Sequence, residues 1–395
     1  MDHNRQELSR RKFIVKMTAV GATLMINPLF SLGKIDDDPR IAEIVARTTG
    51  VDTHNHIDVP LNTDELPGPT VDLANNIRKS GLSAICMTFA VDYQKLSREG
   101  EAYDRFIDGL NAMDEVLKTN NLKRSFNLAD IETAHKEHRP TVIQSVEGAH
   151  FLEGKLGRVE VAYNRGLRQL GLLHDSDASI PLGDVYTNPP KWGGLTSFGA
   201  DVIRECERLG ILVDLTHASN ETINAALKIT TKPVIISHTG LDTQLGKNEF
   251  MAKMMRPRLI SKEQAKIVAS AGGVVGIWTH LSDTPLEYAQ NVKAMVDVIG
   301  IDHVCIGTDT KMTPAYRSPA TSGSKPVDPK SKPPNGKISG RVGERTNEAW
   351  QDQKNGFYFT VVEAMLRVGF VEAEIARIGG GNFCRVFDSA TSGRK

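Results

Sequence analysis

Short apolar runs alternate with longer amphipathic stretches along the chain after residue 50. The short runs have the length of strands, and the longer ones repeat apolar residues at helical spacing. This alternation predicts parallel strands joined by crossover helices. The expected strands are 50–57, 82–90, 141–147, 167–174, 211–217, 233–238, 272–278 and 303–309. The clearest helices are expected over 104–119, 198–210, 261–272 and 285–300.

Eight strand–helix units predict an α/β fold of the (β/α)8 or TIM-barrel type, with a single catalytic domain over residues 34–395. A doubly wound open sheet could also hold eight strands, but no GxGxxG follows the first one, so dinucleotide binding has no support. Residues 311–345 break the alternation, with six prolines and eight basic residues. This Pro/Lys-rich insertion is expected to be irregular, either a solvent loop or a lid over the strand ends.

Histidines and carboxylates stand where most of these strands end. In a (β/α)8 barrel the carboxyl ends of the strands meet at one mouth, where catalytic side chains lie. Five of the 11 histidines and two carboxylates occupy such positions: His54, His56, Glu147, His174, His217, His238 and Asp309. The pair His54 and His56 alone would be equally consistent with two ordinary histidines, whereas the convergence of all seven favours a metal centre.

Imidazole nitrogens and carboxylate oxygens are usual ligands of zinc and its neighbours. His54 and His56 are two residues apart on a strand, so they share a face and can bind one ion. Glu147 has two oxygens and can bridge to a second ion, which His217 and His238 would hold. Two such ions would make hydroxide available near neutral pH, and Asp309 could orient that water and carry its proton.

The N-terminus resembles an export signal. The sequence SRRKFIVKM, beginning at Ser9, is similar to the twin-arginine motif, and a moderately apolar run follows it. Residues 1–33 are therefore expected to be a twin-arginine-type signal that sends the protein to the periplasm or outside the cell. The alternative is a basic amphipathic helix of the mature protein. The apolar run is too short for stable membrane insertion.

The composition excludes some partners and chemistries. Lysine plus arginine equal aspartate plus glutamate at 48 each, and removing residues 1–33 leaves a net charge of −3. Nucleic-acid binding is therefore not expected. The four cysteines are widely spaced and form no CxxC pair, so neither a disulfide framework nor a thiolate zinc site is expected. Cys86 and Cys305 are predicted to pack as small apolar side chains.

Several segments in consistent order resemble the membrane (renal) dipeptidase family. They are EGAH (147–150), LLH ending at His174, DLTHAS (214–219), KPVIISHT (232–239), RLISKE from Arg258, CIGTD (305–309) and GGGNFCRVF (379–387). The resemblance implies a zinc-dependent barrel that hydrolyses dipeptides, often with a D-residue at the C-terminal position, and that often forms homodimers. The GGGN sequence at 379–382 is expected to form a structural turn.

The resemblance also implies roles for individual residues. His54, His56 and Glu147 would bind one zinc ion, and Glu147, His217 and His238 the other. His174 would polarise the scissile carbonyl. Arg258, in preference to Arg256, would bind the substrate carboxylate. Asp309 would handle the proton and help to hold the substrate amine.

The chain departs from the family pattern at two positions. His56 stands where most members carry aspartate, and Lys311 replaces a second aspartate after the last strand. These changes make the site more electropositive. They keep open a hydrolase of another small amide or ester, such as an N-acyl amino acid or a lactam. A non-catalytic exported binding protein is the third alternative, and the intact set of ligands argues against it.

Overall fold

The computed structural model describes residues 38–316, 350, 353 and 355–392 of the chain. Eight parallel strands follow one another in chain order, and β1 pairs with both β2 and β8, so the sheet is closed. They are β1 (Val51–His56), β2 (Ala84–Thr88), β3 (Thr141–Val146), β4 (Leu167–Gly171), β5 (Leu212–Asp214), β6 (Ile235–Thr239), β7 (Val274–Ile277) and β8 (Val304–Ile306). The predicted barrel and its eight strands are confirmed.

The strands are shorter than the predicted runs. The expected strand 167–174 ends at Gly171, yet Leu172 and Leu173 remain buried beyond it. Because buried loop residues are as apolar as strand residues, the pattern cannot mark where pairing stops. The eighth strand ends at Ile306, and a two-residue strand β9 (Thr310–Lys311), which was not predicted, then pairs with β1.

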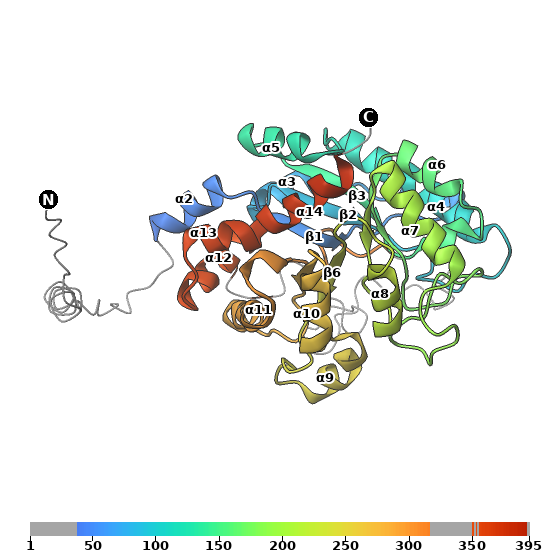
Figure 1. Ribbon diagram of the computed structural model, residues 1–395. Coiled ribbons are helices and arrows are strands. Elements are labelled where there is room, and N and C mark those ends of the chain that lie inside the picture. The colour runs from blue at the N-terminus through green and yellow to red at the C-terminus, as the bar shows by residue number, and fades with distance from the viewer. Residues whose placement is uncertain (1–37, 317–349, 351–352, 354, 393–395) are drawn as a thin grey trace, which may run out of the picture. The chain divides into compact units, whose positions relative to one another are not determined.

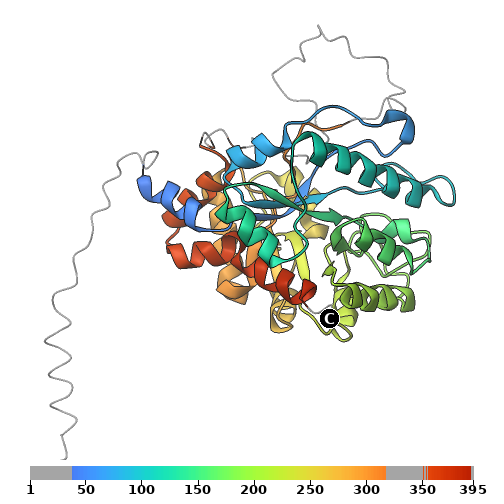
Figure 2. The same cartoon turned by 90° about the horizontal axis from the view of Figure 1, so that it is seen from above.

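Helices surround the barrel (Figures 1 and 2). The four predicted helices are present as α4 (Glu101–Thr119), α7 (Ser197–Leu209), α10 (Lys262–Ser270) and α11 (Pro285–Ile299). The remaining α-helices are α2 (Pro39–Arg47), α3 (Leu73–Ser80), α5 (Leu128–Lys136), α6 (Arg158–Asn164), α8 (Asn220–Leu227), α9 (Glu249–Met255), α12 (Phe357–Arg367), α13 (Glu372–Ala376) and α14 (Asn382–Thr391). No helix in these described parts of the chain is long and apolar enough to cross a membrane.

Local sequence explains where several of these helices begin. The side chains of Thr196, Ser261 and Thr284 each accept a backbone hydrogen bond at the start of α7, α10 and α11 respectively. Such caps satisfy N–H groups that have no partner inside the helix. Helix α7 then ends at Leu209 and is followed by the C-cap residue Gly210, whose φ of 86° favours glycine.

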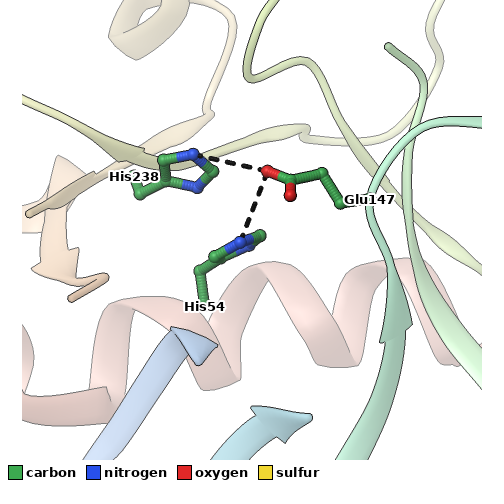
Figure 3. A group of neighbouring side chains, drawn as sticks. All are labelled: His54, Glu147 and His238. Atoms are coloured by element: carbon green, nitrogen blue, oxygen red, sulfur yellow. Dashed lines mark ion pairs between the residues drawn. The ribbon is translucent and has the colours of Figure 1, made fainter. Parts of the chain in front are cut away.

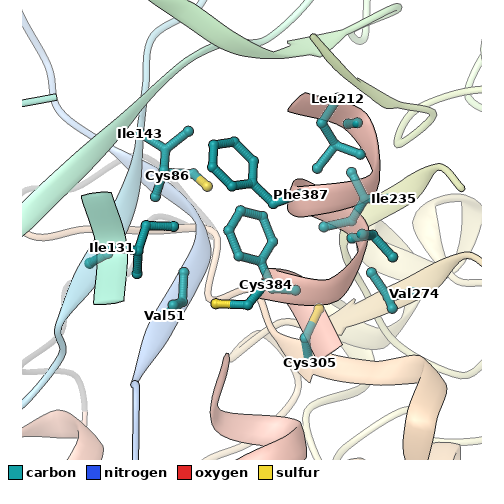
Figure 4. Close-up of a cluster of buried hydrophobic side chains, with 14 residues drawn as sticks. Val51, Cys86, Ile131, Ile143, Leu212, Ile235, Val274, Cys305, Cys384 and Phe387 are labelled. Atoms are coloured by element: carbon teal, nitrogen blue, oxygen red, sulfur yellow. The ribbon is translucent and has the colours of Figure 1, made fainter. Parts of the chain in front are cut away.

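The last helix closes the barrel at the end opposite the candidate site. Phe383 and Phe387 of α14 pack into a buried cluster with residues at or near the beginnings of the strands, among them Val51, Leu212 and Val274 (Figure 4). Cys86 and Cys305 lie in the same cluster, as predicted, and all four cysteines are buried and free. The apolar core therefore fills one half of the barrel and leaves polar side chains to the other.

The expected turn at 379–382 is wrong. Residues 377–381 form a π-helical segment, η7 (Arg377–Gly381), which joins α13 to α14 without a break. The glycines have another purpose, because a Cβ on Gly380 would lie 2.0 Å from the carbonyl oxygen of Thr49. They allow close backbone approach rather than a change of chain direction.

Two of the predicted segments fall mainly outside the described residues. The export signal, residues 1–33, lies entirely outside them. The insertion 311–345 is described only as far as Tyr316, whose hydroxyl donates to Glu65.

Gly307→Ala is expected to destabilise the protein by about 1–3 kcal/mol or more, as overpacked cores do. A Cβ at this position would lie 1.7 Å from the carbonyl oxygen of Ser237 inside the barrel. Urea unfolding of both proteins, followed by circular dichroism, measures the change. The control is Gly157→Ala, because a Cβ there meets nothing within 4 Å. Equal stability of the two variants would contradict the close approach of Gly307 to Ser237 inside the barrel.

Candidate metal centre

Glu147 lies at the centre of the predicted site. It directly follows β3, and its side chain is 4% exposed. Its Oε1 atom is 3.4 Å from Nε2 of His54, 2.9 Å from Nε2 of His217 and 3.6 Å from Nε2 of His238. Figure 3 shows His54, from β1, and His238, from β6, with their rings facing this carboxylate. Four strand ends that are far apart in the sequence thus meet at one carboxylate.

The second oxygen of Glu147 is the clearest sign of a cation. Oε2 is buried and has no hydrogen-bond partner among the described residues, although Nε2 of His174 is 3.3 Å away and Nε2 of His56 is 3.7 Å away. A buried carboxylate oxygen without a hydrogen bond is costly, and a metal ion would satisfy it. The residues present therefore fit a metal centre.

All five predicted histidines are oriented in the same way. Each has a hydrogen-bond partner at Nδ1: the hydroxyl of Ser237 for His54 and His238, Tyr93 for His56, Asp92 for His174, and Asp175 for His217. Each Nε2 atom is left facing Glu147 at the distances given above. Metal-binding histidines are usually held by such a partner on the other ring nitrogen.

Asp309 completes the group. Its Oδ1 atom is 3.1 Å from Nε2 of His56 and 3.9 Å from Nε2 of His54. Burial alone would raise the pKa of Asp309, but the neighbouring His238, His280 and His56 hold it well below its usual value. The aspartate is therefore ionised at the mouth of the barrel.

The ligand atoms form three overlapping groups, each within 4.8 Å. They are His54–Glu147–His238, His54–His56–Asp309 and Glu147–His174–His217. Since Glu147 and His54 belong to two groups each, the three groups form one continuous cluster of candidate ligands. His174 belongs to the third of these groups. The family resemblance implies for it a role toward the scissile carbonyl.

Two residues of the site have a strained backbone. His217 has a φ of 68° and Asp309 a φ of 53°, in the left-handed region that residues other than glycine rarely adopt. Each such residue costs about 1–3 kcal/mol and persists where the surrounding structure requires it. The strain aims both side chains into the mouth.

His174 is held by Asp92, which sequence reasoning did not identify. Nδ1 of His174 donates to Asp92 over 2.7 Å, and Ser176 donates to the other oxygen. Burial would raise the pKa of Asp92, but the bond from His174 and its charge lower it to about 2. Burial opposes protonation of His174, while Glu147 and Asp92 together raise its pKa. Asp92 follows β2 and lies 82 positions before His174, so nothing in the sequence indicated that the two residues are in contact.

Arg258 lies beside the site and Arg256 does not. The Nη2 atom of Arg258 is 2.5 Å from Asp175, whose other oxygen accepts from Nδ1 of His217, whereas Arg256 is exposed. Burial lowers the pKa of His217, but Asp175 and Glu147 outweigh it and raise this pKa to about 10. The pair of Arg258 and Asp175 was not foreseen, because 83 residues separate them.

Three further residues have hydrogen-bond partners outside the groups of candidate ligands. Lys311, which stands where the family has aspartate, donates to Asp58 over 2.5 Å. Asp58 therefore has a structural partner and lies in no metal-binding group. His150, in the EGAH segment, is buried, and its Nε2 bonds to Ser176 rather than to Glu147.

A (β/α)8 barrel whose mouth gathers oriented histidines around a buried carboxylate defines a metal-dependent hydrolase. The sequence matches the description "Membrane dipeptidase (Peptidase family M19)" over residues 39–317, and the chain belongs to this family. The predicted family is confirmed, and with it the predicted class of enzyme, a metallo-dipeptidase.

Individual relatives are more distant. Dipeptidase verJ of Clonostachys rogersoniana is 30% identical over 170 residues, which are 42% of this chain and 41% of that protein. An amidohydrolase from Pseudomonas aeruginosa superposes with a TM-score of 0.67 at 21% identity, over 89% of this chain and 99% of that one. A metallo peptidase from Rhodobacter sphaeroides superposes with a TM-score of 0.62 at 15% identity, over 87% and 99%. At these identities the two structures show the shared fold.

Proposed function

We propose that this chain is an exported dipeptidase that hydrolyses the peptide bond of dipeptides with the help of two zinc ions. The observation that carries the proposal is the buried Glu147, within 3.6 Å of three histidines through one oxygen and, among the described residues, without a hydrogen bond at the other. Family membership supports the choice of a peptide bond over other bonds.

Glu147 would be shared by both ions. His54 and His56 would hold the first ion with it, and His217 and His238 the second. When bound, the two cations would act as Lewis acids and lower the pKa of a nearby water molecule. The residues supply both oxygen and nitrogen ligands, which suits zinc.

The remaining side chains would act on the substrate. His174, fixed by Asp92 at Nδ1, would donate from Nε2 to the oxygen of the scissile carbonyl. Asp309 would accept a proton through Oδ1 and pass it to the leaving amine. Arg258 would bind the terminal carboxylate, for which its planar guanidinium is suited.

A D-residue at the C-terminal position is part of the proposal. The R. sphaeroides metallo peptidase is described as liganded with a phosphinate mimic of the dipeptide L-Ala-D-Ala. The shared fold makes a similar preference a reasonable first choice for this chain. L-Ala-D-Ala and L-Ala-L-Ala should therefore be compared directly.

Export by a twin-arginine-type signal over residues 1–33 also remains a proposal, supported by Arg10 and Arg11 in the sequence. A periplasmic or secreted enzyme would meet dipeptides released outside the cytoplasm. Arg10→Lys combined with Arg11→Lys should retain the protein inside the cell. Unchanged export of this double variant would exclude the twin-arginine route.

A second candidate is a hydrolase of another small amide or ester, such as an N-acyl amino acid or a lactam. Two observations favour it: His56 replaces the aspartate usual in the family, and Arg258 is already paired with Asp175. The first observation concerns a proposed ligand of the metal centre, and the second concerns the guanidinium proposed for the substrate carboxylate; Glu147 and its three nearest histidines are present in either case. The second candidate therefore shares the metal centre and differs in specificity.

A substrate panel separates the candidates. Protein lacking residues 1–33 is saturated with zinc and incubated with dipeptides, N-acyl amino acids and lactams, with and without a chelator. Chelator-sensitive release of amino acids from dipeptides supports the first candidate, and cleavage of capped or cyclic amides alone supports the second. No cleavage of any compound would contradict both.

Arg258→Met is expected to raise KM about 10- to 100-fold for substrates with a free terminal carboxylate, with a smaller change in kcat. The variant loses a charge-assisted hydrogen bond to that group and keeps an unbranched apolar stem similar to that of arginine. Steady-state kinetics on a dipeptide and its C-terminal amide measure the effect. Arg256→Met is the matched control, and an equal rise in KM for the amide would contradict the role.

A further inference from the structure

His280 is a buried histidine that the proposed reaction does not use. It follows β7, is 4% exposed and packs edge-on against Trp278, with ring centroids 5.0 Å apart. Its Nε2 atom is 2.9 Å from Oδ2 of Asp309. An ionised carboxylate can only accept, so Nε2 carries the hydrogen and donates it to Asp309.

The orientation of His280 is opposite to that of the five site histidines. Their Nδ1 atoms have partners and their Nε2 atoms face Glu147, whereas Nε2 of His280 is bonded to Asp309. Its Nδ1 is buried without a hydrogen-bond partner among the described residues. The next residue, Leu281, has a φ of 64°, which is unfavourable for leucine. Nδ1 of the buried His150 is also without a partner among these residues, so what distinguishes His280 is its bond to Asp309.

The two oxygens of Asp309 have different surroundings because of this contact. Oδ2 accepts the hydrogen bond from His280. Oδ1 is 3.1 Å from Nε2 of His56 and 3.9 Å from Nε2 of His54. Rotation of the carboxylate would exchange the two atoms. The bond from His280 opposes that rotation and keeps Oδ1 directed toward the histidine pair on β1.

We propose that His280 is a positioning residue: it holds Asp309 so that one oxygen of this carboxylate faces the His54–His56 side of the metal centre. The expected effect on turnover rests on the proposed function, because it assumes that Asp309 takes part in the hydrolysis. Among the predicted ligands, His280 is hydrogen-bonded to Asp309 alone, and its other connection to the site is packing through Trp278, which stacks on His238 with ring centroids 6.5 Å apart. The bond to Asp309 makes the inference testable separately from the substrate assignment.

The first test compares His280→Leu with His280→Gln, because the amide nitrogen of glutamine can replace the Nε2 donor. On the best dipeptide, His280→Leu should lower kcat about 10- to 100-fold, the usual cost of losing an outer hydrogen-bond partner, with KM within about twofold. His280→Gln should recover most of this loss. His303→Leu is the control, since His303 donates to the carbonyl of Gly273 away from the site.

The second test is a double-mutant cycle with Asp309→Asn that needs no turnover. Zinc affinity is measured by competition with a chelator for wild type, both single variants and the double variant. His280→Leu should weaken zinc binding about tenfold in the wild-type background, because Asp309 belongs to a candidate ligand group with His54 and His56 and would add to zinc affinity without being a principal ligand. It should change zinc binding less than twofold once Asp309 is replaced, because the carboxylate it positions is gone.

Additive losses, or a glutamine variant as impaired as the leucine variant while thermal unfolding is unchanged, would overturn the positioning role. A wild-type protein that cleaves no dipeptide but shows the predicted non-additive zinc affinities would overturn the proposed function and support the inference about His280. The two failures are thus distinguishable.

Discussion

Glu147→Gln is expected to lose zinc and turnover together. Glutamine keeps the size of the side chain but removes the negative charge that three histidines surround at 2.9 to 3.6 Å. It also places a neutral amide where a shared carboxylate would offset the charge of two cations. Zinc content after dialysis should fall from two ions per chain to less than one. Turnover should fall about 1000-fold or more, since Lewis-acid stabilisation is worth several kcal/mol.

Metal analysis and kinetics on the same preparation check this expectation. Glu160→Gln serves as the control, because Glu160 lies half-exposed on α6, away from the predicted ligands, and should leave both quantities unchanged. A Glu147→Gln protein that retains two zinc ions with tight affinity would show that the carboxylate is not a shared ligand. The whole assignment of the two ions would then have to be revised.

Asp309→Asn is expected to retain two zinc ions at saturating zinc and to lose turnover by about 100- to 10,000-fold, the range for removal of a general acid–base group. Asparagine preserves the shape and can still accept from His280, but it cannot take up a proton. Because the ions would be held mainly by the histidines and Glu147, their number should not change.

Zinc stoichiometry measured in excess zinc, together with kcat, tests this second expectation. Asp297→Asn on α11 is a suitable control, since that aspartate is exposed and pairs only with Lys293 among the described residues. Near-wild-type turnover in Asp309→Asn would reject the proton-handling role. Loss of an ion at saturating zinc would instead make Asp309 a principal ligand.

The alternation of apolar runs was sufficient to predict the barrel and the set of residues at its mouth. In a closed parallel sheet every strand ends at the same rim, so a histidine or carboxylate that closes a strand is placed there without knowledge of the loops. His54, Glu147 and His238 illustrate this, because each lies at or directly after a strand end. Their meeting follows from topology rather than from local sequence.

The partners of these residues could not be predicted in the same way. Asp92, Asp175 and His280 reach the site from loops, and their contacts with His174, Arg258 and Asp309 depend on loop conformations that no periodicity encodes. His280, for example, bonds to a carboxylate that lies 29 positions further along the chain. The turn predicted at the GGGN segment was wrong for a related reason. Glycines that permit close packing cannot be distinguished in the sequence from glycines that make a turn.

X-ray diffraction from zinc-saturated crystals, recorded at wavelengths on both sides of the zinc absorption edge, locates the ions without reference to activity. The account predicts two anomalous peaks that share the Glu147 carboxylate, one beside His54 and His56 and the other beside His217 and His238. A single peak, or peaks that Glu147 does not touch, would contradict it.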